Sequence, residues 1–401
     1  MESLPHNLSG HYASDKKEIL SLCTNRQGYS IADLARCLGA SIPKVTRIVS
    51  EMVQEGYLVE LGKTMSSGGR RASLFGLNPN AGYFVGIHVE NESISIAVTD
   101  FPGNIVNTIE NIPFRLGSAR KSVHEMCLKV LSCISTQMNL DCSRIAAVGL
   151  DITGRVNRLS GYSYSFFISE EKPIRSLLEE EFRCPVIVEN DSRAMAWGEY
   201  VCGAAGDCKT VLSLNVGWGL GMGMVLDGKL FYGKSGFSGE FGHFPLLDNN
   251  QYCRCGKIGC LETGASGLAL HRTVMEKLSE GRSSVLSSAY RKGREISLDD
   301  ILEAVRKEDV LVIECIEQMG ATLGKALAGL INIFNPDLVI LGGRLSVTGR
   351  YLLPPLRSAV NKHSLNIVNN DTTIKVSELG KKAGAIGSSL LAKNELLGTL
   401  N

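Results

Sequence analysis

Four side chains that commonly bind metal ions lie within one short stretch of the chain. His243, Cys253, Cys255 and Cys260 fall in the segment GEFGHFPLLDNNQYCRCGKIGCLE. Zinc favours four tetrahedral ligands drawn from thiolate and imidazole groups, and these residues supply a Cys3His set. Glycines between the cysteines permit tight turns of the backbone. A redox pair, or simply buried thiols, is the alternative interpretation.

A metal shell closed by four protein ligands leaves no coordination position for water, so this pattern predicts a structural Zn²⁺. Zinc is favoured over iron because the surrounding residues show no redox role. The metal would fix the loop that presents Glu240, His243 and Glu262. One nitrogen of the imidazole can bind zinc while the other faces a polar ligand, so the metal is expected to support a binding pocket.

The composition bounds the class of protein. A chain of 401 residues suggests two or three domains, and 44% hydrophobic with 21% charged residues is typical of a soluble globular protein. No run approaches the roughly 18 apolar residues that span a bilayer. The first residues, MESLPHNLSGHYASDKKE, lack the pattern of a secretory signal, so we expect a cytoplasmic protein with reduced thiols. A net charge of +1 means that any DNA contact must come from a local patch.

Two amphipathic helices are predicted near the start of the chain. The apolar residues of segment 31–38 repeat at helical spacing after Ser30, a residue type favoured at N-caps. A second apolar stripe runs through segment 42–53 after a short glycine turn. With an earlier apolar helix around residues 19–22, these form a three-helix unit in which segment 30–55 is typical of a helix-turn-helix.

A basic hairpin follows these helices. The strand-like runs YLVEL and SLFGL flank GKTMSSGGRR, which is glycine-rich, basic and free of acids, and this pattern is typical of a wing. An ordinary helical hairpin with a solvated face is the alternative, and the basic hairpin disfavours it. The predicted DNA contacts are Ser41, Lys44, Thr46 and Arg47 on the second helix, and Arg70 and Arg71 at the hairpin tip.

The rest of the chain has an α/β pattern. Strand-like runs such as YFVGIHV, SISIAVTD, IAAVGLDI, PVIVEN, TVLSLNV and LVILGG alternate with helical stretches such as KSVHEMCLKVLSCI and RAMAWGEYV. An order β-β-β-α-β-α, met twice with glycine-rich hairpins, suits two related lobes around a cleft.

Several separated motifs resemble those of the ROK family, which is named for repressors, open reading frames and sugar kinases. They are GGRRASLFGLNP, VENDSRAMAWGE, GEFGH followed by CRCGKIGCLE, and NPDLVILGG. The resemblance is to its repressor branch, similar to the xylose and N-acetylglucosamine repressors. It implies an N-terminal winged helix-turn-helix (residues 1–78) followed by an actin-like sugar kinase ATPase fold of two lobes. Residues 79–401 would then bind sugar and form oligomers, with the zinc loop at 243–260.

The resemblance also implies a set of sugar contacts. Carboxylates accept hydrogen bonds from sugar hydroxyls, and an amide can both donate and accept. Gly154 falls where the family has a glycine turn beside the sugar, although the usual preceding proline is Thr153 here. The implied sugar-binding residues are Asn190, Asp191, Glu240, His243 and Glu262.

The resemblance leaves two functions open, a repressor and an ATP-dependent sugar kinase. A kinase of this family would use Asp191 as general base and hold Mg-ATP on two glycine-rich hairpins. The first hairpin normally begins DxGxT, but this chain has HVENE at 88–92, where His88 offers no hard oxygen for magnesium. Trp218 replaces threonine in the second hairpin, and Arg193 replaces an asparagine. These losses favour a non-enzyme in which Asp191 is a vestigial base, with neither ATP nor Mg²⁺ expected.

The sequence therefore predicts a sugar-responsive transcriptional regulator, most simply a repressor of carbohydrate-utilisation genes. A homodimer or homotetramer would bind a palindromic operator DNA, and a sugar or sugar derivative in the cleft would change the spacing of the DNA-binding units. A protein effector in place of the sugar, and a bifunctional kinase and regulator, remain alternatives.

Overall fold

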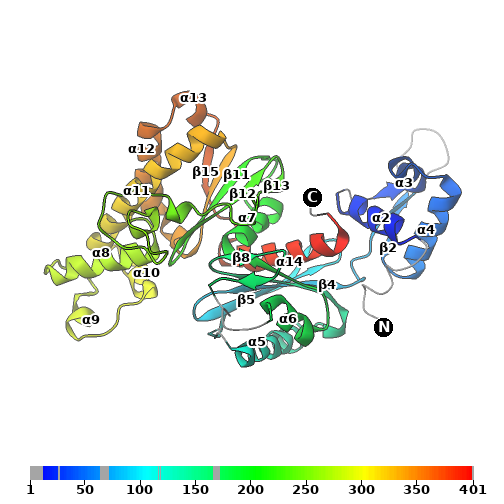
Figure 1. Ribbon diagram of the computed structural model, residues 1–401, viewed down its shortest axis with the longest axis horizontal. Helices are drawn as coiled ribbons and strands as arrows, with labels where there is room; N and C mark the ends of the chain where they lie inside the picture. Colours follow the sequence, from blue (N-terminus) through cyan, green and yellow to red (C-terminus); the bar gives the residue numbers. More distant parts are fainter. Residues whose placement is uncertain are drawn as a thin grey trace. The chain divides into compact units, whose positions relative to one another are not determined.

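The computed structural model describes residues 12–25, 28–63, 72–115, 117, 119–165 and 172–399 (Figure 1). The chain forms two compact units. The first contains the residues up to Ala194 and those from Gly384 onward, and the second is Met195–Ala383. The predicted boundary between residues 78 and 79 falls inside the first unit and stays a prediction. Among the described residues, no helix has the length and apolar character that crossing a membrane requires.

The predicted N-terminal helices and strands are present. They are α2 (Ala13–Asn25), α3 (Ile31–Leu38), α4 (Ile42–Gln54), β2 (Leu58–Lys63) and β3 (Ser73–Leu77), and a short strand β1 (Tyr29–Ser30) that was not predicted joins them. Ser30 caps α3 through a capping box with Asp33. The stripe of α4 that includes Val45 and Ile48 is buried, and the strands form an antiparallel sheet in the order β1-β3-β2. The hairpin tip at residues 64–71 lies outside the described residues.

The rest of the first unit is a five-stranded sheet with helices on both faces. Its strands are β4 (Tyr83–Val89), β5 (Ser93–Asp100), β6 (Ile105–Pro113), β7 (Ile145–Ile152) and β10 (Val186–Asn190), in the order β10-β7-β4-β5-β6. Figure 1 shows α5 (Arg120–Ser132) and α6 (Ile174–Phe182) on one face and α14 (Ala383–Leu397) on the other. The predicted α5 ends two residues early, because a π-helical turn covers Cys133–Gln137.

Glycines in the middle of two strands let α14 approach the sheet closely. A Cβ atom at Gly86 would lie 1.8 Å from the carbonyl oxygen of Ala385, and one at Gly149 would lie 2.1 Å from that of Ser388. Both distances are far below a van der Waals contact, so each strand must have a glycine where the helix backbone passes.

The second unit repeats the design of the first. Its strands are β11 (Val211–Val216), β12 (Leu220–Leu226), β13 (Lys229–Leu230), β14 (Leu338–Gly342) and β15 (Thr373–Val376), in the order β13-β12-β11-β14-β15. Its main helices are α7 (Asp191–Cys202), which begins in the first unit, α8 (Gly267–Ser279), α9 (Ser287–Arg291), α10 (Leu298–Arg306), α11 (Val310–Phe334) and α12 (Gly349–His363). The core lies between the sheet and α8, α10, α11 and α12.

The two sheets share one topology. In each, the first strand is central, the second and third extend to one side by antiparallel pairing, and the fourth and fifth extend to the other side by parallel pairing. The predicted repeat of β-β-β-α-β-α is therefore confirmed as two related α/β lobes.

Candidate metal centre and ligand site

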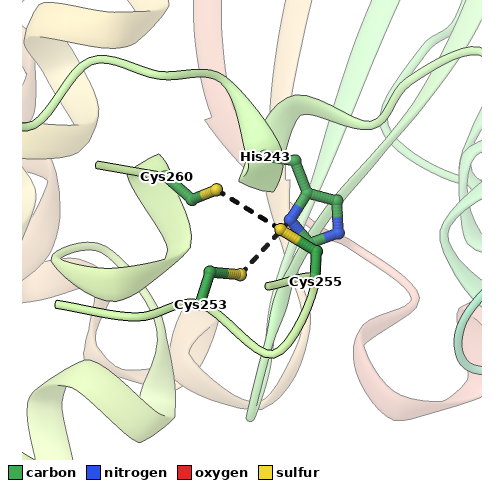
Figure 2. Close-up of side chains that lie close together, drawn as sticks. All are labelled: His243, Cys253, Cys255 and Cys260. Atoms are coloured by element: carbon green, nitrogen blue, oxygen red, sulfur yellow. Dashed lines mark hydrogen bonds between the residues drawn. The ribbon is translucent and has the colours of Figure 1, made fainter. Parts of the chain in front are cut away.

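The structure brings the four predicted metal ligands together. The ligand atoms of His243, Cys253, Cys255 and Cys260 all lie within 4.8 Å of one another. Figure 2 shows the ring and the three thiols pointing toward a common centre; Nδ1 of His243 lies 3.5 Å from Sγ of Cys253, and Sγ of Cys255 lies 3.6 Å from Sγ of Cys260. A tetrahedral zinc site with Zn–S bonds of about 2.3 Å spaces its sulfur atoms about 3.8 Å apart. The donor set and its spacing therefore fit Zn²⁺.

The loop that carries the cysteines is folded by backbone contacts and glycine turns. The amide of Cys253 donates to the carbonyl of Lys257 at 2.8 Å, and an antiparallel bridge pairs Tyr252 with Ile258. Gly256 has a φ of 84°, in the left-handed region that favours glycine. The turn between the second and third cysteines therefore requires the glycine that the sequence supplies.

Polar groups extend from this cluster to the neighbouring hairpin. The other ring nitrogen of His243, Nε2, lies 3.6 Å from a carboxylate oxygen of Glu240. Glu262 has one carboxylate oxygen 3.6 Å from Sγ of Cys253, and its other oxygen accepts a hydrogen bond from the amide of Leu220 at 3.1 Å. Glu262 thus connects the cysteine loop to β12, as expected of a side chain that the loop presents.

Asn190 and Asp191 lie in the first unit, where β10 ends and α7 begins. The amide group of Asn190 donates to the carbonyl of Gly154 at 2.9 Å and to the carboxylate of Asp191 at 2.9 Å. The amide of Ser192 donates to the same carboxylate at 2.7 Å. Burial and the nearby Asp151 raise the pKa of Asp191 to about 6, although His88 opposes this shift.

The predicted sugar contacts therefore form two groups. Asn190 and Asp191 are bonded to each other in the first unit, and Glu240, His243 and Glu262 surround the cysteine loop of the second. That all five contact one sugar stays a prediction.

His88 takes part in a buried ion pair. It is the first residue of HVENE at 88–92, the segment that the resemblance aligns with the first phosphate hairpin of the kinases. His88, on β4, contacts the carboxylate of Asp151, on β7, through Nδ1, and both side chains are buried. Burial alone would lower the pKa of His88, but the charge of Asp151 and its hydrogen bond, helped by Glu90 and Asp191, raise that pKa to about 9. The imidazole is therefore a cation at neutral pH. Sequence reasoning predicted the loss of a metal ligand at His88 but missed its partner.

The second glycine-rich hairpin is covered by the start of α8. Trp218 packs against the core of the second unit, with its ring centroid 5.8 Å from that of His271. The amide of Gly267 donates to the carbonyl of Gly217 at 2.8 Å, and a Cβ at Gly267 would lie 2.6 Å from that oxygen. The hairpin is thus held by packing contacts and by a backbone hydrogen bond to the start of α8.

Arg193 makes an internal ion pair. Its Nε donates to a carboxylate oxygen of Glu189 at 2.7 Å, and both side chains are buried. The second oxygen of Glu189 lies 4.0 Å from Nε of Arg158. The side chain of Arg193 is therefore held inside the first unit, close in sequence to Asn190 and Asp191.

Lys44 and Arg47, two predicted DNA contacts on α4, form ion pairs with acids of α2 and of α4 itself. Lys44 lies 3.0 Å from a carboxylate oxygen of Asp15, and Arg47 lies 3.1 Å from one of Glu51. Both cations also lie over the ring of Tyr12, at 5.7 and 5.8 Å from its centroid. Sequence reasoning missed Tyr12 and Asp15, because only the packing of α2 against α4 places them there.

The other predicted DNA contacts differ in their surroundings. Ser41 is the exposed N-cap residue of α4. Thr46 is exposed, and its hydroxyl donates to the carbonyl of Ile42 at 2.8 Å. The hydroxyl oxygen of Thr46 can therefore still accept a hydrogen bond from a ligand. Arg70 and Arg71 lie outside the described residues.

The chain is similar to bacterial transcriptional regulators along most of its length. The chain is 28% identical to the xylose repressor of Caldicellulosiruptor bescii, and the aligned region covers 96% of both proteins. It is 28% identical to the DNA-binding transcriptional dual regulator NagC of Escherichia coli over 92% of this chain and 88% of that protein. The crystal structure of a ROK family transcriptional regulator, a homologue of the E. coli MLC protein, matches with a TM-score of 0.78 and 26% identity over 96% of both chains.

Sugar kinases match a shorter part of the chain. A glucokinase of Halalkalibacterium halodurans is 30% identical over 78% of this chain and 96% of its own. The Streptomyces griseus ROK glucokinase, solved with glucose and AMPPNP, matches with a TM-score of 0.67 and 28% identity over 78% of this chain and 100% of its own. The model of the ROK family matches residues 84–395, and the chain belongs to the ROK family.

Proposed function

We propose that the protein is a sugar-responsive, DNA-binding transcriptional repressor of carbohydrate-utilisation genes. The observation that carries this proposal is the extent of the matches. Repressor relatives align with 96% of the chain, whereas a kinase relative that is itself almost fully aligned reaches only 78%. The family match begins at residue 84, so the additional part includes α2, α3, α4 and the β2–β3 hairpin.

These additional elements suit contact with DNA. The exposed face of α4 carries Lys44, Thr46 and Arg47, which can bond phosphates and base edges in a major groove. A homodimer or homotetramer would present two such helices to the half-sites of a palindromic operator. The repressor and DNA-binding relatives support a role in DNA binding, for which we propose residues 1–78 as the domain.

The metal in this proposal is a structural Zn²⁺ held by the Cys3His cluster. Four protein ligands complete its preferred shell, so the ion supplies a cross-link between the segment of His243 and the cysteine loop. The cross-link would hold Glu240 and Glu262 on a fixed backbone, which supports their role as sugar contacts.

A sugar or sugar derivative is the proposed effector. Asn190, Asp191, Glu240, His243 and Glu262 supply acceptors and donors that match hydroxyl groups. If the sugar and operator DNA each bind one arrangement of the lobes more tightly than another, the sugar changes the affinity for operator DNA, and DNA changes the affinity for the sugar by the same factor.

Gel shifts on DNA from upstream of the protein's own gene, with and without a panel of monosaccharides and amino sugars, test both parts of the proposal. We expect specific binding that one of the sugars alters. Specific binding that none of the sugars changes would remove the effector part and favour a protein effector. Failure to bind any fragment more tightly than random DNA would remove the repressor.

An ATP-dependent sugar kinase is the second candidate function. The matches to glucokinases and the raised pKa of Asp191, which suits a general base near neutral pH, favour it. The His88–Asp151 ion pair and the packed Trp218 oppose it, because they fill the positions expected to face magnesium and phosphate. A coupled assay for ADP production with glucose, xylose and N-acetylglucosamine decides between them. We expect no turnover above background, and robust sugar-dependent turnover would favour the kinase.

A further inference from the structure

A buried ion pair and a predicted ligand residue lie at one end of the first unit's sheet. His88 and Asp151 are register partners near the ends of the parallel strands β4 and β7. Asn190 ends β10 in register with Ile152, so Asp191 begins α7 at the same edge. The three ionisable side chains therefore share one small region.

The histidine is held firmly in this region. The hydroxyl of Ser388, on α14, donates to Asp151 at 2.7 Å, so both oxygens of that carboxylate have partners. A Cβ atom at Gly384 would lie 2.4 Å from Nδ1 of His88, which shows how closely α14 covers the imidazole ring. The close packing of α14 restricts the movement of the ring on that side.

Among the described residues, the charged groups that act most strongly on His88 are acids. They are Asp151 from β7, Glu90 from the β4–β5 turn and Asp191 from the start of α7. From α14, Gly384 lies against the imidazole ring, and the uncharged Ser388 bonds to Asp151. A positive charge in this position stabilises the ionised form of each carboxylate around it.

We propose that His88 is a positioning residue for the ligand site, whose imidazolium charge keeps the Asp191 carboxylate ionised and able to accept hydrogen bonds. The inference rests on the proposed function in one respect, which is that Asp191 contacts the effector. The coupling between His88 and Asp191 itself can be measured without any effector.

The sign of the expected effect follows from the surroundings of Asp191. Burial and Asp151 raise the pKa of Asp191 to about 6, and His88 acts against them. Ligand binding that needs the ionised carboxylate is therefore present at pH 7 and is lost as the pH falls through about 6. Without the charge of His88 the pKa of Asp191 rises further, so binding is lost at a higher pH.

The first experiment measures the coupling by NMR in the full-length protein without effector. Histidines are labelled with ¹³C at Cε1, and the signal of His88 is assigned by its absence in His88→Gln. We expect an imidazolium at pH 8 with a midpoint near 9, and a lower midpoint, by about half a pH unit or more, in Asp191→Asn. A midpoint near the ordinary value of 6.5, or one that Asp191→Asn leaves unchanged, would overturn the inference.

The second experiment measures the affinity of the wild type and His88→Gln for glucose, xylose and N-acetylglucosamine between pH 5 and 9 by calorimetry. His88→Gln keeps a polar side chain without the charge, and His124→Gln, at a half-exposed histidine on α5, is the matched control. We expect the acid limb of the binding profile to move to higher pH by at least about one pH unit in His88→Gln only. A uniform loss of affinity at every pH would show a purely structural role and refute the inference.

The two experiments fail in different ways. If none of the sugars binds the wild type, the sugar part of the proposed function fails, and the NMR midpoints still decide whether His88 and Asp191 are coupled. If the midpoints respond as expected but the acid limb does not move, Asp191 is not the group that the bound sugar requires, and the inference fails.

Discussion

The ion pair between Lys44 and Asp15 predicts that DNA binding is restrained from within the protein. Lys44 must leave the carboxylate of Asp15 before its ammonium group can neutralise a phosphate. The pair is partly solvated, with exposed fractions of 40% and 25%, so its strength is that of a surface pair. Asp15→Asn should therefore tighten operator binding, because it removes the competing carboxylate.

The size of this effect follows from the geometry. Surface pairs are typically worth about 0.2 to 1 kcal/mol, so two recognition helices in a dimer should gain about 0.4 to 2 kcal/mol, or roughly 2- to 30-fold in affinity. Lys44→Ala should weaken binding. It should also make the negative slope of log K against log salt less steep by about 0.9 for each lost phosphate contact. Fluorescence anisotropy with a labelled operator across a salt series measures both quantities.

A double-mutant cycle tests the reasoning. In the Lys44→Ala background, Asp15→Asn should give little or no gain, because the ammonium group that it would release is absent. Asp371→Asn, at an exposed acid of the second unit, is the matched control for the change in net charge. An equal gain from Asp15→Asn in both backgrounds would mean that the carboxylate merely repels DNA, and the account of a competing ion pair would be refuted.

Three further predictions concern separate parts of the molecule. Arg47→Ala should weaken operator binding by about 1 to 3 kcal/mol if it reads a base edge, while Arg282→Ala in the second unit should not, as gel shifts can measure. Cys255→Ser should lower the zinc content from about one ion per chain, while Cys37→Ser, at an exposed thiol on α3, should retain the metal. Elemental analysis measures the zinc content, and a full zinc content in Cys255→Ser would contradict the ligand set. Gly149→Ala should destabilise the protein by at least about 1 to 3 kcal/mol, because its Cβ would overlap the backbone of α14. Gly329→Ala, whose Cβ would meet nothing within 4 Å, should be neutral or stabilising. Thermal unfolding measures both, and similar melting temperatures for the two variants would contradict the close packing.

The metal cluster could be predicted from the sequence because its geometry is almost local. Three cysteines fall within one loop, a histidine precedes them closely, and glycines mark the turns, so spacing alone limits the arrangement. The strands could be predicted equally well, because each is a short apolar run bounded by turn residues. The repeated order of elements then predicted two lobes, and the two sheets have that topology.

The His88–Asp151–Ser388 network could not be predicted in this way. Ser388 is 237 residues from Asp151 in sequence, and a helix from the end of the chain must pack on the first unit's sheet to bring them together. A weak signal exists in the glycines at 86 and 149, inside otherwise apolar strands, and in the small residues of AGAIGSS at 383–389. Small residues on both surfaces are typical of close backbone approach, but they do not identify which helix meets which strand.

The proposed function requires a kinase-like body that keeps a ligand site without catalysis, and the positions of the altered hairpin residues are compatible with it. The residues implied to contact sugar come from the junction of β10 with α7 and from segment 240–262 around the cysteine loop, whereas His88 and Trp218 lie on the β4–β5 and β11–β12 hairpins. Each altered residue contacts partners within its own unit, His88 with Asp151 and Trp218 with His271. Because the two sets belong to different elements, phosphate and metal binding can be lost while the hydrogen-bonding groups for a hydroxylated ligand stay in place.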